Sequence, residues 1–352
     1  MPHEKNLSLQ DLSYDELNNI IKAWGYPSFR AEQVYIAAQQ NKDYDNMSNL
    51  PKDLRHKLKE SYFATAVTII ETFASKDGTE KYLYRLNDGN VIEGVFMPHS
   101  YGNTLCVSTQ VGCRLNCAFC ASSLNGLIRN LTSGEMLGQV LSVNALKGGT
   151  LKERKITNIV LMGSGEPLDN FDNVVKFLKA VSDEKGINIS LRNISLSTAG
   201  LVDKIIELAD MNLSVTLTIS LHAPDDKTRS KLMPINNKYN IPRVIEAAKY
   251  YFEKTGRRVI FEYSLIDGQN SDIESALKLA KRLKGFPCHV NLINLNFVKE
   301  RGLRGVSKDT TKEFLDTLAA QNISATLRRS MGNDIEGACG QLRNKYLKEG
   351  SL

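Results

Sequence analysis

Three cysteines lie close together in the sequence C-R-L-N-C-A-F-C, at Cys113, Cys117 and Cys120. Three thiolates at this spacing can each bind one iron of a [4Fe–4S] cluster, whereas proteins usually supply four cysteines to such a cluster. A set of three leaves one iron open to a substrate or cofactor. The spacing therefore predicts an iron–sulfur site at which one iron binds a ligand from outside the chain.

The same cysteines have an alternative interpretation as a zinc site, with Cys106 as the fourth ligand. Structural zinc sites favour paired CxxC half-sites, whereas this chain has one lopsided group of thiols. The spacing favours the iron–sulfur cluster. It leaves a zinc-dependent, non-enzymatic nucleic-acid-binding module as the alternative from another class.

Length and composition limit the class of protein. The chain has 352 residues, of which 42% are hydrophobic and 24% charged, which is ordinary for a soluble globular protein with one large domain and a small one. No run approaches the ~18 apolar residues that span a bilayer, and the N-terminus lacks the apolar core of a signal peptide. We therefore expect no membrane association.

Cysteine usage and charge indicate the compartment and the kind of partner. Four of the six cysteines lie between 106 and 120, which favours intracellular metal or redox chemistry over a secreted disulfide framework, and hence the cytoplasm. The net charge of +6 is compatible with an RNA partner, although many metabolic enzymes are equally basic.

The hydrophobic pattern divides the chain into three parts. Residues 1–62 show helical spacing of apolar residues and predict a small accessory domain, either a plain packing cap or an RNA-handling module. Residues 63–100 contain short strand-like runs separated by Asp-Gly and Asn-Asp-Gly-Asn turns, and predict an antiparallel β extension or linker. The main domain follows at 101–345.

Strands and helices alternate from about residue 102. The expected strands are 104–108, 156–162, 192–197, 214–220, 258–265, 287–293 and 322–328. Helical stretches of ten or more residues lie between most of them, which predicts an α/β fold with a parallel sheet, open or closed into a barrel. In a barrel, functional residues lie where strands end and loops begin.

Several polar residues occupy these strand ends. Gly163-Ser164-Gly165-Glu166-Pro167 follows the second strand; its glycines let a ligand approach the backbone, and Glu166 can accept hydrogen bonds from an ammonium group. The other candidates are Ser197, Ser220, Leu221, His222 and Asn296. Taken alone, each of these is more often a turn residue or a helix cap, and His222 is compatible with a structural role.

Two further cysteines lie outside the cluster motif. Cys106 precedes it by seven residues, and Cys339 lies near the C-terminus in a polar stretch flanked by glycines. An isolated cysteine is usually a small buried hydrophobe, and we interpret Cys288 in this way because it lies within or beside a strand. The surroundings of Cys339 fit that interpretation poorly.

The cysteine motif, with Phe119 before its last cysteine, and the GSGEP sequence resemble the radical S-adenosylmethionine (SAM) superfamily, in which the open iron binds the amino and carboxylate groups of SAM. A more specific resemblance, to the RlmN/Cfr family of radical SAM RNA methyltransferases, is carried by 106–120, 163–167, 220–236 and 328–342. It covers about 90–345, and the N-terminal part also resembles the family's accessory domain. It implies a partial (β/α)6 TIM-like barrel, a [4Fe–4S] cluster and two SAM molecules per turnover.

The resemblance implies roles residue by residue. Cys339 carries a methyl group taken from one SAM, and after hydrogen abstraction by a radical from a second SAM it becomes covalently joined to the RNA. Cys106 releases the product by forming a disulfide with Cys339, and either Glu93 or Cys106 removes the adenine proton. The implied cluster ligands are Cys113, Cys117 and Cys120. The implied SAM ligands are Gly165, Glu166, Ser197, Ser220, Leu221, His222 and Asn296.

The reaction implied is methylation of adenosine C2 in 23S rRNA, at the peptidyl-transferase centre, and in tRNA, 3′ of the anticodon. The resemblance also implies that a flavodoxin or ferredoxin donates the electron and that the protein is a monomer in the cytoplasm. The Cfr branch instead methylates C8 of the same rRNA adenosine and confers antibiotic resistance. Val111 favours the RlmN branch, because Cfr-like chains have an additional cysteine there, although both branches share the catalytic cysteines.

A target base must leave its stack to reach a barrel interior. We therefore expect basic residues at the mouth of the barrel, although a solvated surface charge is the commoner role for any one of them. The candidates are Arg114, Arg129, Arg301, Arg304, Arg328 and Arg329.

Overall fold

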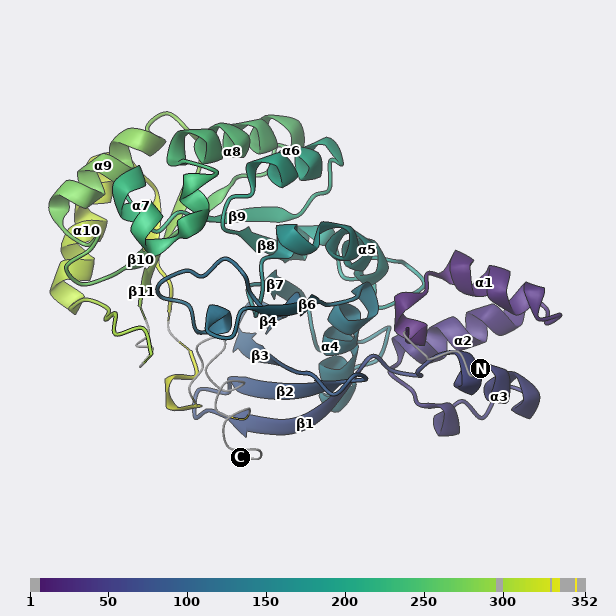
Figure 1. Cartoon of the computed structure of the whole chain (residues 1–352). Helices are drawn as coiled ribbons and strands as arrows, with labels where there is room; N and C mark the ends of the chain where they lie inside the picture. The colour runs from purple at the N-terminus through teal and green to yellow at the C-terminus, as the bar shows by residue number, and fades with distance from the viewer. Residues whose placement is uncertain (1–6, 296–299, 330, 336–345, 347–352) are drawn as a thin grey trace.

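A computed structural model of the chain describes residues 7–295, 300–329, 331–335 and 346 (Figure 1). Two residues with expected functions, Asn296 and Cys339, lie outside this set. The described part has a helical N-terminal region beside an α/β body. None of its helices is both long and apolar enough to cross a membrane.

The N-terminal helices form where the sequence provides a cap and an apolar stripe. Ser13 accepts a hydrogen bond from the Glu16 backbone N–H, and the Glu16 carboxylate accepts one from the Ser13 N–H, so that a capping box starts α1 (Tyr14–Ala23). α2 (Phe29–Gln39) and α3 (Lys52–Ser61) follow. Their apolar faces bury a hydrophobic cluster of their own. The expectation of a helical N-terminal region is confirmed.

Buried polar contacts join this region to the body. The Asp11 carboxylate accepts a hydrogen bond of 2.7 Å from the backbone N–H of Gly134, in α4 (Ser133–Leu146). Gln10 accepts one of 2.9 Å from the Ala66 N–H, just before the first strand. The contact is close, because a Cβ on Gly134 would lie 2.4 Å from the Asp11 carboxyl carbon.

One mixed sheet of ten strands runs through the described body. Its first four strands are antiparallel neighbours: β1 (Val67–Ala74), β2 (Glu80–Leu86), β3 (Val91–His99) and β4 (Gly102–Cys106). From β4 onward all neighbours are parallel, in the order β7 (Asn158–Leu161), β8 (Ile194–Thr198), β9 (Thr216–Ser220), β10 (Ile260–Leu265), β11 (His289–Asn294) and β12 (Ala325–Leu327).

This topology confirms the α/β fold with a parallel sheet and an antiparallel extension. The described sheet has seven parallel strands where a partial (β/α)6 barrel has six, because the short β12 adds to the edge at β11. The edge strands β1 and β12 do not pair with each other in the described residues, so the barrel is open. The crossover helices include α5 (Phe171–Val181), α6 (Val202–Asp210), α7 (Asp226–Leu232), α8 (Ile241–Thr255), α9 (Ile273–Leu283) and α10 (Lys308–Ala320).

The two faces of the parallel strands differ in polarity, as alternation requires. One face carries buried apolar residues that join the main core, among them Leu105, Leu196 and Phe261. The crossover helices cover this face of the sheet (Figure 1). The register places their neighbours on the opposite face, where Ser197 is next to Thr218 and Ser220 is next to Glu262. The opposite face is therefore polar and available for chemistry.

A short ribbon, β5 (Gln110–Gly112) and β6 (Leu127–Asn130), follows β4 and was not expected from the sequence. Strands of three and four residues are too short for alternation to reveal. Gly112 has φ 84°, and a Cβ there would lie 2.0 Å from the Gly126 carbonyl oxygen, so only glycine fits. The ribbon closes the loop that carries the three cysteines.

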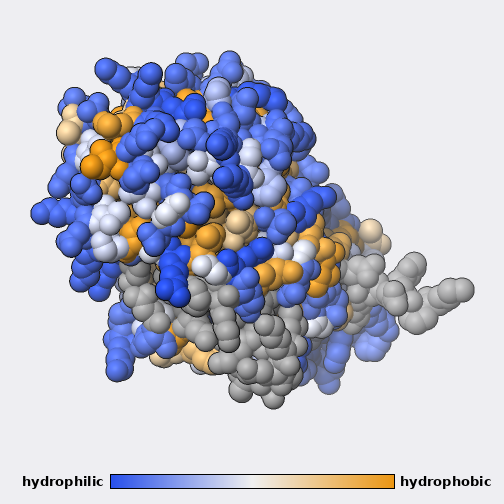
Figure 2. All heavy atoms as spheres, turned by 60° about the vertical axis from the view of Figure 1, so that its left-hand side comes forward, coloured by the Kyte–Doolittle hydropathy of each residue, from blue (hydrophilic) through white to orange (hydrophobic). Residues whose placement is uncertain are grey.

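The face of the molecule drawn in Figure 2 is mostly hydrophilic. Figure 2 shows one face with polar side chains around its margins and apolar side chains gathered near its middle. Apolar atoms make up much of any protein surface, so this distribution alone identifies no partner.

Candidate functional site

The three cysteines of the motif lie on the loop between β5 and β6. The Cys113 N–H donates a hydrogen bond of 2.9 Å to the Gly126 carbonyl, which closes the base of the loop. The Ala118 N–H donates one of 2.8 Å to the carbonyl of Leu232, the last residue of α7. The backbone of the loop is thus fixed against both the ribbon and the body.

The thiols of this loop lie in each other's electrostatic field. Burial, with smaller contributions from the nearby Cys120 and Glu166, raises the pKa of Cys113 to about 12. Burial also raises the pKa of Cys117, again with Cys120 and Cys113 adding to the effect. Such thiols are protonated at pH 7 and lose their protons when they bind a cationic centre. Binding of a cationic metal group to these thiols would therefore release protons.

Arg301 braces the same loop from the far end of the chain. Its Nε donates to the Cys120 carbonyl at 3.2 Å, and its Nη2 donates to Ser123 Oγ at 2.8 Å. Arg301 was expected at an RNA-facing mouth, but its described contacts are with the cysteine loop.

Three more of the expected RNA-facing arginines bind partners inside the protein. Each therefore has an acidic partner within the chain, whereas the commoner role expected for each was a solvated surface charge. The salt bridges join Arg114 to Asp169, Arg129 to Asp88 and Glu135, and Arg328 to Glu262.

The GSGEP sequence forms a loop after β7 that packs closely against residues 108–110, which follow β4. Ser108 Oγ accepts a hydrogen bond of 2.9 Å from the Ser164 N–H, and Gln110 Oε1 accepts one of 2.8 Å from the Glu166 N–H. A Cβ on Gly165, which has φ 108°, would lie 2.6 Å from the Gln110 side chain. Glycine is therefore required for this close approach.

The loop delivers Glu166 into a buried position at the strand ends. Its Oε2 accepts a hydrogen bond of 2.7 Å from the Ala199 N–H, just after β8, and its Oε1 accepts one of 3.0 Å from the Leu168 N–H. Burial raises the pKa of Glu166 to about 7, although these hydrogen bonds oppose the rise. An ammonium group placed beside it would favour the ionised form and would be bound by it.

His222 follows β9 with a φ of 53° and is buried. Its Nδ1 accepts a hydrogen bond of 2.9 Å from the Ser264 N–H, so the neutral ring carries its proton on Nε2. Burial lowers the pKa of His222 to about 3. The ring packs edge-on against Phe119, with centroids 4.9 Å apart, and so supports the residue before Cys120.

The remaining expected SAM ligands in the described part lie at neighbouring strand ends. Ser197 and Ser220 lie on the polar face of β8 and β9. Leu221 has a fully buried side chain, and its N–H donates 3.0 Å to the Glu262 carbonyl. Asn296 lies outside the described residues.

Glu93 and Cys106 lie on the same sheet face, on adjacent strands. Cys106 pairs with Val95, and Glu93 is two residues from Val95 along β3. Such diagonal neighbours lie about 7–8 Å apart. Glu93 is buried and forms an ion pair of 3.5 Å with Lys81, which is also buried. Cys339, their expected partner, lies outside the described residues.

The zinc alternative requires several ligands around one ion. No three His, Cys, Asp or Glu side chains within the described ranges have that arrangement. A [4Fe–4S] cluster differs, because each cysteine binds a different iron and the thiols stay apart. Cys288 is buried in the main core, in keeping with its interpretation as a small hydrophobe.

Comparisons with known proteins agree with this geometry. Residues 107–280 match the radical SAM superfamily, and residues 7–63 match the ribosomal RNA large subunit methyltransferase N-terminal domain. A protein of Lachnospira eligens named "Probable dual-specificity RNA methyltransferase RlmN" is 46% identical over 97% of each chain, and one of the same name from Clostridium botulinum strain Eklund 17B is 49% identical over 97% of each. The chain belongs to the RlmN family of radical SAM proteins.

A solved structure supports the same assignment. The crystal structure of a radical SAM methyltransferase from Sphaerobacter thermophilus is 42% identical, with a TM-score of 0.91 over 96% of this chain and 99% of that one. The N-terminal helices and the sheet therefore share one architecture with another radical SAM methyltransferase.

Membership in the RlmN family implies a [4Fe–4S] cluster and SAM as cofactors. The residues of this chain fit both groups. The loop offers three thiols, two of which interact electrostatically with Cys120, and Glu166 offers a buried carboxyl group. Ser122 Oγ, beside the loop, and Thr218 Oγ1, on the polar face, are buried and have no hydrogen-bond partner in the described structure. Such atoms are suited to a polar ligand.

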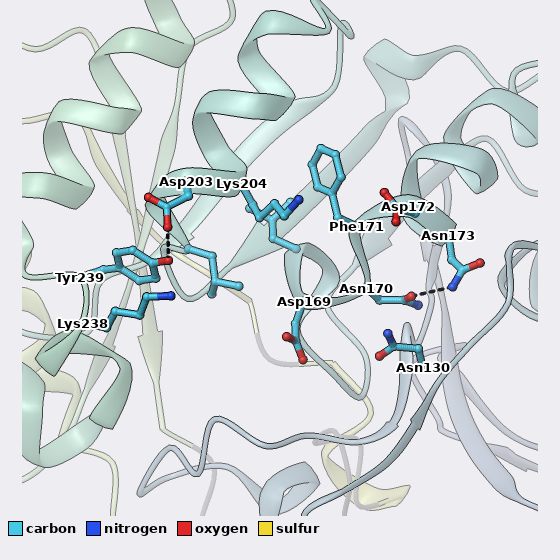
Figure 3. A pocket seen from close by; sticks show the side chains of 12 residues that line it. Asn130, Asp169, Asn170, Phe171, Asp172, Asn173, Asp203, Lys204, Lys238 and Tyr239 are labelled. Atoms are coloured by element: carbon cyan, nitrogen blue, oxygen red, sulfur yellow. Dashed lines mark hydrogen bonds between the residues drawn. The ribbon is translucent and has the colours of Figure 1, made fainter.

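A groove of about 380 Å³ adjoins the helix that follows the GSGEP loop (Figure 3). Its walls carry both signs of charge, with Asp169, Asp172 and Asp203 near Lys204 and Lys238. None of the expected cluster or SAM ligands of the RlmN-type site lines it. The groove therefore adjoins the candidate site, because Leu168 in its lining donates to Glu166, but it contains none of the expected ligands.

Several residues of the site were not identified from the sequence. One of them is Gln110, which holds the Glu166 backbone. Arg301 was predicted only as a basic residue at the mouth, and its contact with the cysteine loop was not predicted. Lys81 occupies a position in the strand pattern that an exposed residue would occupy, and Arg229 lies between two exposed lysines. The sequence pattern therefore did not indicate that either residue is buried. The polar stretch between Cys106 and Cys113 was the one signal that pointed to Gln110.

Proposed function

We propose that this chain methylates C2 of adenosine in 23S rRNA, at the peptidyl-transferase centre, and in tRNA, 3′ of the anticodon. The names of its full-length relatives, dual-specificity RNA methyltransferases, support both substrates. The observation that carries the proposal is the placement of Glu93 and Cys106 on the sheet face that also carries Ser197 and Ser220.

In this proposal the cofactor site comprises two sets of side chains. Reduction of SAM at the cluster supplies the radical chemistry. The chain's own residues hold the groups in place: Glu166 binds the SAM ammonium group, and the strand ends bind its other polar atoms. The cluster ligands are Cys113, Cys117 and Cys120. The SAM ligands are Gly165, Glu166, Ser197, Ser220, Leu221, His222 and Asn296.

Two cysteines act on the RNA. The Cys339 thiolate would take a methyl group from SAM, which leaves as S-adenosylhomocysteine. After loss of one hydrogen atom, the methylene carbon would bond to C2 of the adenine, and the adduct would return to the iron–sulfur cluster the single electron that cleaved the second SAM. Cys106 then attacks the Cys339 sulfur, the sulfur–carbon bond breaks, and its electron pair leaves with the carbon, which takes up a proton. Methylated RNA and a Cys106–Cys339 disulfide result. Either Glu93 or Cys106 removes the C2 proton.

The proposal also covers the domain division, the electron donor, the oligomeric state and the compartment. The chain is divided into an accessory domain at 1–62, a β extension at 63–100 and the radical SAM core at 101–345. A flavodoxin or ferredoxin supplies the electron, and the protein acts as a monomer in the cytoplasm, where an oxygen-sensitive cluster is protected.

The test separates the two cysteines. Protein isolated from cells is expected to carry a methyl group on Cys339. Cys106→Ala is expected to methylate Cys339 and then stall with RNA attached, visible on denaturing gels as a band that ribonuclease removes. Cys339→Ala forms no adduct, and Cys288→Ala, a buried core cysteine, serves as the control. Normal turnover of Cys106→Ala without an adduct contradicts the proposal.

Mass spectrometry of nucleosides from treated rRNA and tRNA tests the regiochemistry. We expect 2-methyladenosine in both. An 8-methyladenosine product would instead assign the chain to the Cfr-type reaction, which uses the same cysteines.

A further inference from the structure

Arg229 has a fully buried side chain in the middle of α7. No described carboxylate oxygen lies within 4.0 Å of its guanidinium, since none of the described salt bridges includes it. Burial of a charge without an ion-pair partner is costly, and an apolar side chain could fill the same space. Such an arrangement calls for a role beyond packing.

Every guanidinium nitrogen of Arg229 donates a hydrogen bond to an oxygen of the body. Nη2 donates to the Ala199 carbonyl at 2.6 Å and to the Ser220 carbonyl at 3.2 Å, and Nε donates to the Leu221 carbonyl at 3.1 Å. Nη1 donates to Asn236 Oδ1 and to the Tyr239 carbonyl, each at 3.0 Å. The side chain thus ties the ends of β8 and β9 to the segment after α7.

These bonds connect Arg229 to the carboxyl group of Glu166. Ala199 accepts from Arg229 through its carbonyl and donates to Glu166 Oε2 through its N–H. The position of the Glu166 carboxyl group therefore depends on a residue that Arg229 holds.

The same helix supports the cysteine loop. Leu232, three residues after Arg229, accepts the hydrogen bond from Ala118 in that loop. Leu232 also packs in one apolar cluster with Cys117 and Phe119. α7 is therefore a bracket between the cysteine loop and the SAM-binding strand ends.

Arg229 also places a positive charge near the thiols. Its guanidinium interacts electrostatically with Cys117, and it lies on the helix whose Leu232 contacts the same loop. Burial lowers the pKa of Arg229 itself to about 10, so the group stays protonated at pH 7. A fixed positive charge beside a cluster stabilises its reduced, more negative form.

We propose that Arg229 is a positioning residue of the cofactor site, which fixes Glu166 for SAM through Ala199 and supplies a buried positive charge to the cluster. The inference rests on the proposed role of Glu166 as a SAM ligand. It concerns the contacts that α7 makes with the cysteine loop and the strand ends, and it does not depend on which RNA carbon is methylated.

The test uses full-length protein reconstituted anaerobically with iron and sulfide. SAM affinity is measured by calorimetry, the cluster midpoint potential by an EPR-monitored titration, and folding by circular dichroism. Arg229→Met is expected to bind SAM at least tenfold more weakly and to have a more negative potential. Arg229→Lys keeps the charge and loses the forked donors, so we expect a wild-type potential with weaker SAM binding.

Arg257→Met is the matched control. Arg257 also donates to a backbone carbonyl, that of Arg192, and to Thr216, at the opposite end of the strands. We expect this variant to leave both measurements within twofold of wild type.

A folded Arg229→Met with wild-type SAM affinity and potential overturns the proposal. If that variant does not fold, Arg229→Lys decides, and any result other than a wild-type potential with weaker SAM binding overturns it. Glu166→Gln distinguishes a failure of the Glu166 assignment from a failure of the Arg229 proposal. Wild-type SAM binding by Glu166→Gln refutes the Glu166 assignment itself, whereas weakened binding there with unchanged Arg229→Met refutes Arg229 alone.

Discussion

The ends of the parallel strands and the N-terminal helices are stabilised in different ways. At the strand ends, charged and polar side chains are buried and hydrogen-bonded to backbone groups, as Glu166, His222, Arg229 and Asn270 are. The N-terminal helices are stabilised by an apolar cluster under an exposed polar surface. Buried polar groups are costly unless fully satisfied, so their concentration at one edge marks that edge as the functional one.

The N-terminal helices bury polar groups mainly where they meet the body. Gln10 and Asp11 are buried there and bond to backbone N–H groups across the junction. The comparison therefore separates three kinds of residue: those that bind cofactors, those that join the two regions, and those that face solvent. The variants below test that separation, from the largest expected effect to the smallest.

Loss of the cluster ligands has the largest expected effect. Cys113→Ala, Cys117→Ala or Cys120→Ala removes a thiolate that has no substitute in the loop, so we expect loss of iron and complete loss of SAM cleavage. Iron and sulfide analysis with a 5′-deoxyadenosine assay measures both, and Cys288→Ala is the control. A stoichiometric four-iron cluster in the triple variant would refute the assignment.

Glu166→Gln removes a charge but keeps the shape of the side chain. A hydrogen bond to a charged group contributes about 1.5–3 kcal/mol, so SAM affinity is expected to fall roughly 10- to 100-fold. Because burial raises the pKa of Glu166 to about 7, the wild-type carboxyl group ionises as pH rises through neutrality. An ammonium group binds the ionised form, so wild-type affinity should increase from pH 6 to pH 8.

Calorimetric titrations across that pH range check this prediction. The affinity of Glu166→Gln should lack the increase, because an amide does not titrate. An equal increase in the variant would show that another group controls SAM binding and would weaken the contrast between the strand ends and the rest of the molecule.

Much of the fold could be predicted from the sequence, but less of the site. The strands from β7 to β11 are runs of β-branched and apolar residues between helical segments, and all lie where expected. β5 and β6 are too short to show a period. Gly165 and Glu166 were predicted as site residues because glycines precede a carboxylate after a strand, and the structure places Glu166 in a buried position at the strand ends. Arg229 and Lys81 were not, because only tertiary contacts distinguish a buried cation from an exposed one.

Asp11→Ala tests the junction between the two regions. The variant leaves the buried Gly134 N–H without its acceptor, which costs about 1–3 kcal/mol of unfolding free energy. Asp15→Ala, on the exposed surface of α1, is the control and should change stability little. Denaturant unfolding measures the loss, and SAM affinity should stay within twofold of wild type. A large loss of SAM affinity would show that the junction and the cofactor site are coupled.

The exposed face of α3 is the place where the N-terminal helices are expected to contact RNA. Lys52, Lys57 and Lys59 are exposed on this helix, while residues 7–63 as a whole carry nearly balanced charge, so any attraction to RNA must be local. Lys57→Ala combined with Lys59→Ala should weaken RNA binding a few-fold, with SAM cleavage unchanged. If both lysines contact phosphates, the slope of log affinity against log salt should fall by about 1–2. Lys22→Ala, an exposed lysine of α1, is the matched control, and filter binding at several salt concentrations measures the effect. An unchanged salt slope would leave these helices with the packing role alone.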